Sequence, residues 1–226
     1  MPGPAPTDLP VFCSWSGGKD SALALHEAIL AGARPRLLVT MMTADGARSR
    51  SHGLHRSVLR AQADAIGVPI RFGAASWSGY EPAFAGLVGE AVAAGAATGV
   101  FGDIDIEGHR EWVERVCARA GAEARLPLWR RERRRVVERL LEAGFEAVIV
   151  AVRDGALPES LLGRRLDRAT LAEIEAAGVD LAGEQGEYHS LVVDGPIFDR
   201  PVAVDPGGRS LRDGVWFLDV TAADPG

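Results

Sequence analysis

The six residues Ser16-Gly17-Gly18-Lys19-Asp20-Ser21 have the composition of an anion-binding turn. They follow an apolar run over residues 11–15 and open a predicted helix over residues 19–31. Backbone N–H groups at a helix start bind anions, and the helix dipole adds about half a positive charge there. Glycine lets the backbone approach phosphate oxygens that any Cβ would block, and the hydroxyls of Ser16 and Ser21 donate further bonds. The segment therefore predicts a phosphate site.

Lys19 is the only lysine among 25 basic residues, the other 24 being arginine. Its compact ammonium is a point charge for a phosphate oxygen, where a planar guanidinium fits less well. Asp20 would repel phosphate unless Mg²⁺ lies between them. Lys19 and Asp20 are therefore predicted to be catalytic, with Asp20 as a metal ligand. Ser14, at the end of the preceding apolar run, joins the predicted nucleotide site.

Two better-known phosphate loops are excluded for this turn. A Walker A loop has glycine where this chain has Cys13, and serine or threonine where it has Asp20. The Rossmann pattern Gly-x-Gly-x-x-Gly is also absent after the first apolar run. The remaining alternative is a plain glycine turn between a strand and a helix.

Three further positions are predicted at the nucleotide from their place at strand ends. Gly102 and Asp103 close a predicted strand over residues 98–104, at the carboxyl edge where open α/β sheets bind ligands. Asp103 is the second expected Mg²⁺ ligand, although a strand-end turn is the alternative. Met42 ends a predicted strand over residues 36–42, where backbone groups can hold adenine, or it is plain core. His52 ends a polar segment over residues 43–52, which is expected to be a mobile loop over the nucleotide or a solvated one.

A second cluster of reactive side chains fills residues 183–190. A carboxylate or a neutral imidazole here can deprotonate ammonium, which has no nucleophilic lone pair until it loses a proton. Glu187 and His189 are therefore predicted to be catalytic; the alternative is a surface turn. The predicted substrate-binding residues are Glu184, Gln185, Gly186, Glu187, Tyr188, His189 and Ser190.

Other charged residues receive weaker predictions. The run Arg130–Arg135 meets an RNA backbone or forms a solvated helix face, and the acidic net charge favours the second. His26 and His55 are expected on solvated helix faces. His109 is left undecided.

Apolar runs alternate with helical segments of 10 to 15 residues up to about residue 153, which predicts βαβ units and a parallel sheet. The predicted fold class is α/β, a Rossmann-like parallel sheet of the HUP type with helices on both faces, plus a smaller C-terminal α+β domain. The predicted domains are residues 1–153 for ATP and residues 154–226 for the substrate. The predicted strands lie over residues 11–15, 36–42, 69–72, 98–104, 125–129, 147–152, 191–193, 202–204 and 215–220, and the predicted helices over residues 19–31, 55–66, 81–94, 107–120, 132–143, 158–163 and 168–177.

Composition narrows the class of protein. The chain has 226 residues and a net charge of −6, which disfavours a surface built to coat nucleic acid. Cys13 and Cys117 are too few for a disulfide framework or a four-cysteine zinc site. No apolar run of about 18 residues exists, and residues 1–6 lack a secretory pattern. A cytoplasmic location is therefore expected, and the arginine and alanine bias suggests a bacterial source.

The motif SGGKDS resembles the PP-loop of the N-type ATP pyrophosphatases, which cleave ATP between its α and β phosphates. Further segments are similar to the diphthine–ammonia ligase family of adenine nucleotide α-hydrolases, and together they span nearly the whole chain. The loop over residues 183–190 departs from the Glu-Gly-Gly-Glu-Phe-Glu-Thr expected in diphthine-modifying members, with Gln185 replacing a glycine and His189 an acid. The similar segments are residues 51–70, 100–121, 126–129 and 183–198.

The resemblance implies an ATP-dependent ligase that uses ATP and Mg²⁺. It would activate a carboxylate as an acyl adenylate, release pyrophosphate, and amidate the carboxylate with ammonia. Free ammonia is favoured because residue 2 is proline, not a nucleophilic cysteine; a partner glutaminase is the alternative source. The family's acceptor is diphthine on elongation factor 2, and a bacterial source suggests a cobalamin-related acid.

Two other functions are weighed against the ligase. A tRNA-modifying PP-loop enzyme usually carries paired cysteines or a zinc site, which this chain lacks. A nucleotide-binding sensor without turnover needs no Lys-Asp pair in its loop. The expected partners are ammonia and a small-molecule or protein carboxylate, with no membrane and no nucleic acid; a homodimer is left open.

Overall fold

The computed structural model describes residues 8–50 and 52–223 and divides them into two compact units. Unit 1 holds residues 8–15, 20–46 and 68–130, and unit 2 holds residues 16–19, 47–67 and 131–223 apart from residue 51. The interpretation of residues 1–6 and of Pro2 lies outside the described residues. Each unit is described by itself below.

Unit 1 contains a five-stranded parallel sheet in the order β3-β2-β1-β4-β5, which confirms the predicted parallel α/β sheet. The central strand β1 has Val11, Phe12 and Cys13 fully buried in succession, as expected for a parallel strand that is covered on both faces. The strands are β1 (Leu9–Ser14), β2 (Ala33–Met42), β3 (Ile70–Ala74), β4 (Thr98–Val100) and β5 (Glu123–Arg125).

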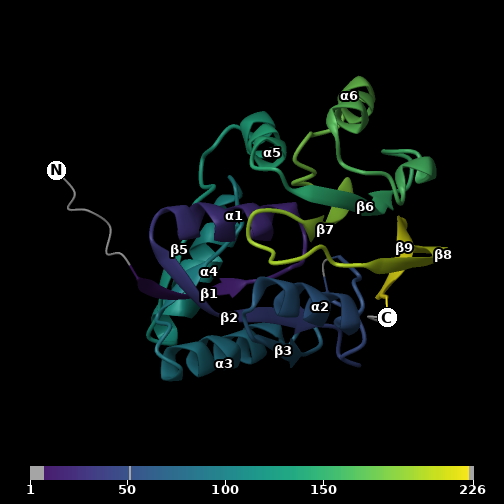
Figure 1. The fold of residues 1–226 in the computed structure, drawn as a ribbon. Helices are drawn as coiled ribbons and strands as arrows, with labels where there is room; N and C mark the ends of the chain where they lie inside the picture. The colour runs from purple at the N-terminus through teal and green to yellow at the C-terminus, as the bar shows by residue number, and fades with distance from the viewer. Residues whose placement is uncertain (1–7, 51, 224–226) are drawn as a thin grey trace. The chain divides into compact units, whose positions relative to one another are not determined.

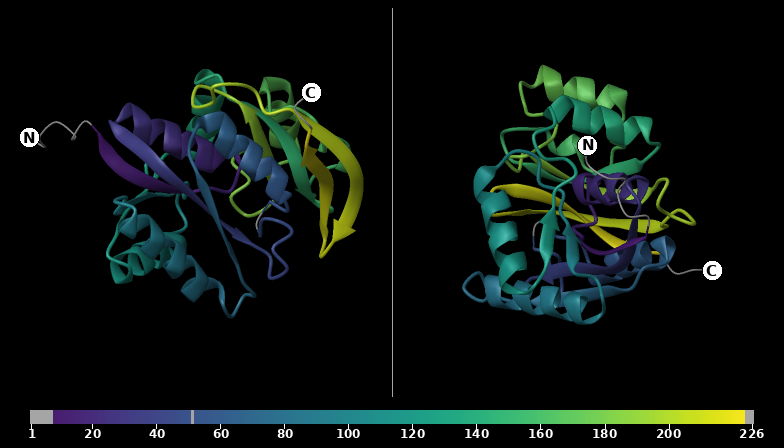
Figure 2. Two further views of the ribbon diagram at one scale, coloured as in Figure 1. Left: turned by 60° about the horizontal axis from the view of Figure 1, so that its bottom comes forward. Right: turned by 90° about the vertical axis from the view of Figure 1, so that its left-hand side faces the viewer.

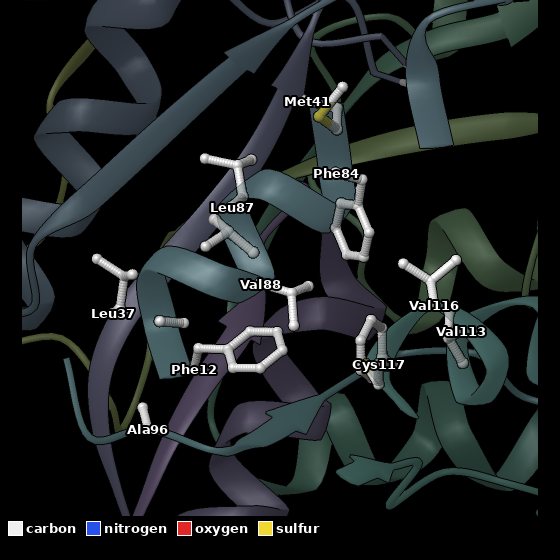
Figure 3. Packing of buried hydrophobic residues seen from close by; sticks show 13 residues of the cluster. Phe12, Leu37, Met41, Phe84, Leu87, Val88, Ala96, Val113, Val116 and Cys117 are labelled. Carbon is white, nitrogen blue, oxygen red and sulfur yellow. The ribbon is translucent and has the colours of Figure 1, made fainter. Parts of the chain in front are cut away.

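Helices cover both faces of this sheet. In Figures 1 and 2, α1 (Lys19–Leu30) lies on one face, and α3 (Tyr80–Ala93) and α4 (Glu107–Arg119) lie on the other. The packing under α3 and α4 is shown in Figure 3, where Phe12 of β1 meets the aromatic and aliphatic side chains of both helices. Phe12 and Phe101 make an edge-to-face pair with ring centroids 6.1 Å apart. This core supports β1, β2 and β4, whose carboxyl ends carry predicted site residues.

Unit 2 is built on a four-stranded antiparallel sheet in the order β7-β6-β9-β8, which confirms the predicted α+β part. Its strands are β6 (Glu146–Arg153), β7 (Tyr188–Asp194), β8 (Val204–Arg212) and β9 (Val215–Ala222). Its helices are α2 (Arg56–Ile66), which packs on β9, α5 (Arg133–Glu142), α6 (Arg168–Ala176) and the 3₁₀ turn η1 (Glu159–Leu161). Among the helices of the described residues, none is long and apolar enough to cross a membrane.

The strand over residues 147–152 was predicted to continue the parallel sheet, and this is wrong. It is β6, which pairs antiparallel with β7 and β9. An apolar run marks a buried strand of either kind, because burial on both faces does not depend on the direction of the neighbours. The predicted domain boundary at residue 153 stays a prediction.

Several predicted element ends were also wrong. The strand predicted over residues 98–104 ends at Val100, and the extended run predicted over residues 125–129 is a strand over Glu123–Arg125 followed by a turn. The helix predicted over residues 158–163 is only the short η1. Most of β8 was not predicted, because this nine-residue strand is largely exposed and has no apolar run. It connects to β9 through a turn at Asp213-Gly214, where both residues have positive φ.

Candidate active site

The predicted phosphate loop packs against α2 and the residues just before it. Gly17 has φ +81°, and a Cβ on it would lie 2.8 Å from Oε1 of Gln62 and 2.8 Å from Cδ1 of Leu54. A Cβ on Gly18 would lie 2.4 Å from Nε2 of His52 and 3.0 Å from the carbonyl oxygen of Ser190. A larger residue at either position would therefore press against these neighbours, and at Gly17 it would also adopt a strained positive φ.

The loop lies along the beginning of β7. The N–H of Val192 donates to the carbonyl oxygen of Gly17 at 2.9 Å, and the N–H of Lys19 donates to Oγ of Ser190 at 3.2 Å. The N–H of Gly18 donates to Oγ of Ser16 at 3.3 Å. The predicted phosphate loop (residues 16–19) and the predicted substrate segment (residues 188–190) are thus in direct contact within unit 2.

Lys19 is buried against an aromatic ring. Its side chain is 5% exposed, and Nζ lies 5.2 Å from the ring centroid of Tyr188. Tyr188 is 1% exposed, and its hydroxyl donates to the carbonyl oxygen of Leu181 at 2.6 Å, which fixes the ring. A cation over an aromatic face is stabilised by the ring quadrupole, so the Tyr188 ring helps to orient the ammonium.

Two imidazoles flank the same loop. The rings of His52 and His189 lie 4.6 Å apart, centroid to centroid. Burial lowers the pKa of His189 to about 4, and the charges of Lys19 and Arg153 contribute to that lowering. Burial also lowers the pKa of His52 well below 6.5, with His189 and Lys19 as additional causes. Both rings are therefore neutral at neutral pH, which avoids a cluster of three cations.

The loop before β7 is organised by an acidic and a basic side chain. Asp180 accepts from the N–H of Glu184 at 3.0 Å and pairs with Arg133 at 2.8 Å. Arg153 donates from its guanidinium to the carbonyl oxygen of Gln185. Glu187 is 8% exposed, and its Oε2 accepts from the N–H of Gln185 at 3.0 Å. The predicted substrate residues 184–190 therefore form an ordered turn that runs into a strand.

The remaining predicted nucleotide residues belong to unit 1. Ser14 ends β1 and Met42 ends β2. A Cβ on Gly102 would lie 2.8 Å from the backbone carbon of Asp20 and 2.9 Å from the backbone nitrogen of Ser21, so only glycine permits this approach to the start of α1. The structure thus brings the segment after β4 against Asp20 and Ser21.

Asp20 and Asp103 are the expected Mg²⁺ ligands, and their chemistry fits that ion. Mg²⁺ is usually held by one or two carboxylates together with substrate phosphates and water. Asp103 directly follows Gly102, which abuts the backbone of Asp20, and its Oδ1 lies 3.3 Å from Nδ1 of His109. Among residues 8–50 and 52–223, no group of three or more His, Cys, Asp or Glu side chains is arranged to hold a metal by itself. The Mg²⁺ site stays a prediction.

One expectation about a single residue needs correction, and the structure adds detail to two others. His55 does not lie on a solvated helix face: it is the N-cap of α2, and its Nδ1 accepts from the N–H of Ser57 at 3.2 Å. In the loop that was expected to be mobile, the backbone of Arg48 forms an isolated antiparallel β-bridge with His55. The side chain of Arg48 pairs with Asp219 at 2.9 Å. Residue 51 lies outside the described residues. The end of the arginine run opens α5 and is paired with acidic residues, as Arg133 is with Asp180.

The two cysteines are not nucleophiles in this fold. Cys13 and Cys117 are buried and form no disulfide. Burial raises the pKa of the Cys13 thiol far above its usual range and that of Cys117 to about 12. Both therefore stay protonated at neutral pH.

Sequence reasoning missed three residues that shape this site, Gln62, Arg153 and Asp180. For Gln62 a signal was present, because it occupies an apolar position of α2, four residues after Val58. A polar amide on a buried helix face needs partners, and the sequence could have flagged it for that reason. No comparable pattern marks Arg153 or Asp180.

Comparison with known families covers almost the whole described chain. The model of the diphthamide synthase N-terminal domain matches residues 10–124, and that of the diphthamide synthase C-terminal domain matches residues 132–223. The diphthine–ammonia ligase of Danio rerio is 32% identical over 97 residues, which are 41% of this chain and 38% of that protein. The diphthine–ammonia ligase of Homo sapiens is 30% identical over 112 residues, 48% of this chain and 42% of that protein.

These matches span about two fifths of the length of the relatives. Among solved structures, a predicted subunit of tRNA methyltransferase from Methanocaldococcus jannaschii covers 83% of this chain and 98% of its own, with 15% identity and a TM-score of 0.43. At that level of similarity, the fold class rests on the strand order and directions described above.

Proposed function

The chain belongs to the diphthamide synthase family, and on that premise we propose that it is an ATP-dependent ligase that amidates a carboxylate with ammonia. The products are the amide, AMP and pyrophosphate. The observation that carries the proposal is the contact between residues 16–19 and the start of β7, where Lys19 donates to Ser190 and Val192 donates to Gly17. That contact places a glycine-rich loop with a buried cation beside a turn that contains a carboxylate and an imidazole.

The first step activates the acceptor. A carboxylate oxygen attacks the α-phosphorus of ATP, and the bond from that phosphorus to the bridging oxygen of pyrophosphate breaks. The electron pair leaves with pyrophosphate, so negative charge grows on the two outer phosphates. Lys19 and the loop N–H groups are the donors in this proposal that stabilise that charge, and preorganised donors of this kind are typically worth about 3 kcal/mol each.

The serine hydroxyls and the strand ends bind the rest of the nucleotide. Ser16 and Ser21 donate to phosphate oxygens, and the backbone at Ser14, Met42 and Gly102 holds the nucleoside. Asp20 and Asp103 would hold Mg²⁺, which supplies charge neutralisation to the phosphates when it is bound. His52 packs over Gly18 as a neutral ring and excludes water from the loop.

The second step transfers the acyl group to nitrogen. The ammonia lone pair attacks the acyl carbon, AMP leaves with the electron pair of the acyl–phosphate bond, and the nitrogen loses a proton. Glu187, a nearly buried carboxylate, is the proposed acceptor of that proton. His189, whose pKa of about 4 makes it a weak base, instead accepts a hydrogen bond from the attacking nitrogen while it stays neutral.

The acceptor is a carboxylate, and two candidates follow from the family. One is diphthine on a protein, the substrate in the names of the relatives from Danio rerio and Homo sapiens. The other is a small cobalamin-related acid. His189 and Gln185 stand where a diphthine-type loop has an acid and a glycine, so the loop over residues 184–190 is the proposed determinant of this choice.

The decisive experiment measures the products. Purified protein is incubated with ATP, MgCl₂, ¹⁵N-ammonium and either a diphthine-bearing elongation factor or a pool of small carboxylic acids. The expected result is AMP and pyrophosphate in equal amounts, together with one ¹⁵N incorporated per acceptor. Formation of ADP and orthophosphate, or AMP formation without any amide in both acceptor arms, would overturn the proposal.

A further inference from the structure

Gln62 is a buried amide that joins the glycine-rich loop to β7. Its side chain is 0% exposed and lies on the face of α2 that also buries Val58 and Leu59. Its Nε2 donates to the carbonyl oxygen of Gly17 at 3.0 Å and to the carbonyl oxygen of Val192 at 2.7 Å. One NH₂ group therefore uses both of its donors on two segments that are far apart in the sequence.

The carbonyl of Gly17 is the critical acceptor. An anion site presents N–H groups to its ligand, so carbonyl oxygens in the same turn must point elsewhere. The Gly17 oxygen accepts from Nε2 of Gln62 and from the N–H of Val192, and Gly17 has the positive φ that such a turn requires. Two donors thus hold this oxygen on the side of α2 and β7.

We infer that Gln62 is a positioning residue for the nucleotide loop. It keeps the Gly17 carbonyl turned away from the phosphates, and it couples the loop to the strand that begins with Tyr188. Gln62 touches neither reacting atoms nor ligand; it acts through Gly17. This inference rests on the proposed function to the extent that the loop binds the phosphates of ATP.

An amide side chain can donate to the carbonyl oxygens of both Gly17 and Val192, and the alternatives of similar size cannot. Glutamate at this position would direct a carboxylate at two carbonyl oxygens, and like partial charges repel. Methionine fills a similar volume but has no donor, so the Gly17 oxygen would lose one of its two partners. Oε1 of Gln62 lies 2.8 Å from the place where a Cβ on Gly17 would stand, so the amide also fills the space beside this glycine.

The test uses Gln62→Met, Gln62→Glu and a matched control, Asp64→Asn, on the exposed face of the same helix. Binding of inorganic pyrophosphate and of ATP with MgCl₂ is measured by calorimetry, and KM and kcat are measured for ATP and for ammonium. Both Gln62 variants are expected to weaken pyrophosphate and ATP binding about tenfold, as the loss of a buried hydrogen bond implies. The KM for ATP should rise while the KM for ammonium stays unchanged, and Asp64→Asn should match the wild type.

Wild-type affinity for pyrophosphate and ATP in a folded Gln62→Met variant would overturn the inference, even if AMP is the product. Conversely, if the wild type forms ADP while Gln62→Met loses pyrophosphate binding, the ligase proposal fails and the inference stands. If both variants fail to fold, the inference is tested on the wild type by NMR. Saturation with pyrophosphate is then expected to slow hydrogen exchange of the Gln62 side-chain amide, and an unchanged exchange rate would overturn the inference.

Discussion

At the scale of single residues, the site combines one buried cation with neutral histidines. Lys19 is 5% exposed and stacked on Tyr188, while the pKa values of His52 and His189 are lowered mainly by burial. A bound triphosphate would therefore meet the charge of Lys19 at this loop, beside two neutral imidazoles. The arrangement concentrates the electrostatic stabilisation on the chain's only lysine.

Replacing Lys19 by alanine is expected to lower kcat by about two orders of magnitude, because a donor to the departing pyrophosphate is lost. Lys19→Arg should not restore full activity, because a planar guanidinium spreads its charge and does not replace the compact point charge of the buried ammonium. Pyrophosphate release is the measurement, and urea unfolding shows whether the variants stay folded. A folded Lys19→Ala protein with the wild-type rate would remove Lys19 from the mechanism.

The neutral state of His189 predicts a loss of stability in acid. Its pKa is about 4 in the folded chain and close to 6.5 when unfolded, so between these pH values the unfolded chain binds more protons. The free energy of unfolding should therefore fall as pH falls from 6.5 towards 4. His189→Asn should lose less stability than the wild type over that window, measured by urea unfolding at pH 7 and pH 5.

His109 provides the control for this prediction. Its side chain is 60% exposed and pairs with Asp103, whereas His189 is buried beside Lys19. His109→Gln removes an exposed imidazole and leaves the buried one in place, so it should keep the acid sensitivity of the wild type. An identical loss of stability in His189→Asn and the wild type would contradict the pKa assignment.

At the scale of elements, close backbone approaches decide where glycine is required. Gly102 follows β4, and a methyl group on it would collide with the backbone of Asp20 and Ser21 at the start of α1. Gly86, in the middle of α3, has open space within 4 Å of the place where a Cβ would stand. The same residue type thus has opposite meanings in the two elements.

Gly102→Ala is expected to destabilise the protein by about 1–3 kcal/mol, because backbone atoms cannot yield to the new methyl group as a flexible side chain can. Gly86→Ala should stabilise it by roughly 0.5–1 kcal/mol, because alanine is the better helix former. Urea unfolding of both variants checks the pair. Equal effects of the two substitutions would mean that the approach of Gly102 to α1 is not tight.

Element prediction succeeded where an apolar run or helical spacing marks the element and failed where neither does. The parallel strands β1 and β2 and the helices α1 to α5 follow from apolar runs and helical spacing. The exposed strand β8 has one half-buried residue at its start and two consecutive glycines, so no alternation marks it. Its pairing with β9 comes from the Asp213-Gly214 turn, a signal that depends on two residues rather than on a pattern.

At the scale of the whole molecule, charge and ligand linkage make a further prediction. The net charge of −6 and the paired arginines at the start of α5 leave little reason to expect an RNA partner. The proposed ligand is instead a nucleotide, which binds the folded state and not the unfolded state. ATP with MgCl₂ should therefore stabilise the folded state by mass action.

At an ATP concentration about 100 times its Kd, the free energy of unfolding should rise by about 2.7 kcal/mol. Thermal unfolding with and without ATP and MgCl₂ measures this, and Lys19→Ala should show a smaller rise at the same ATP concentration. Transfer RNA at about 0.15 M salt should give no comparable shift. Stabilisation by transfer RNA but not by ATP would favour the tRNA-modifying alternative instead.

The sequence by itself determined the glycine-rich loop with its single lysine, the parallel α/β sheet and the reactive cluster over residues 183–190. These are local properties, because glycine content, helix starts and the periodicity of burial are read within about 20 residues. Only the tertiary structure decided that β6 is antiparallel, that the Gln62 side chain joins Gly17 to Val192, and that the backbone N–H of Lys19 donates to Oγ of Ser190. Those contacts link residues 130 and 171 positions apart, and such distant pairings depend on the path of the chain, which no local pattern encodes.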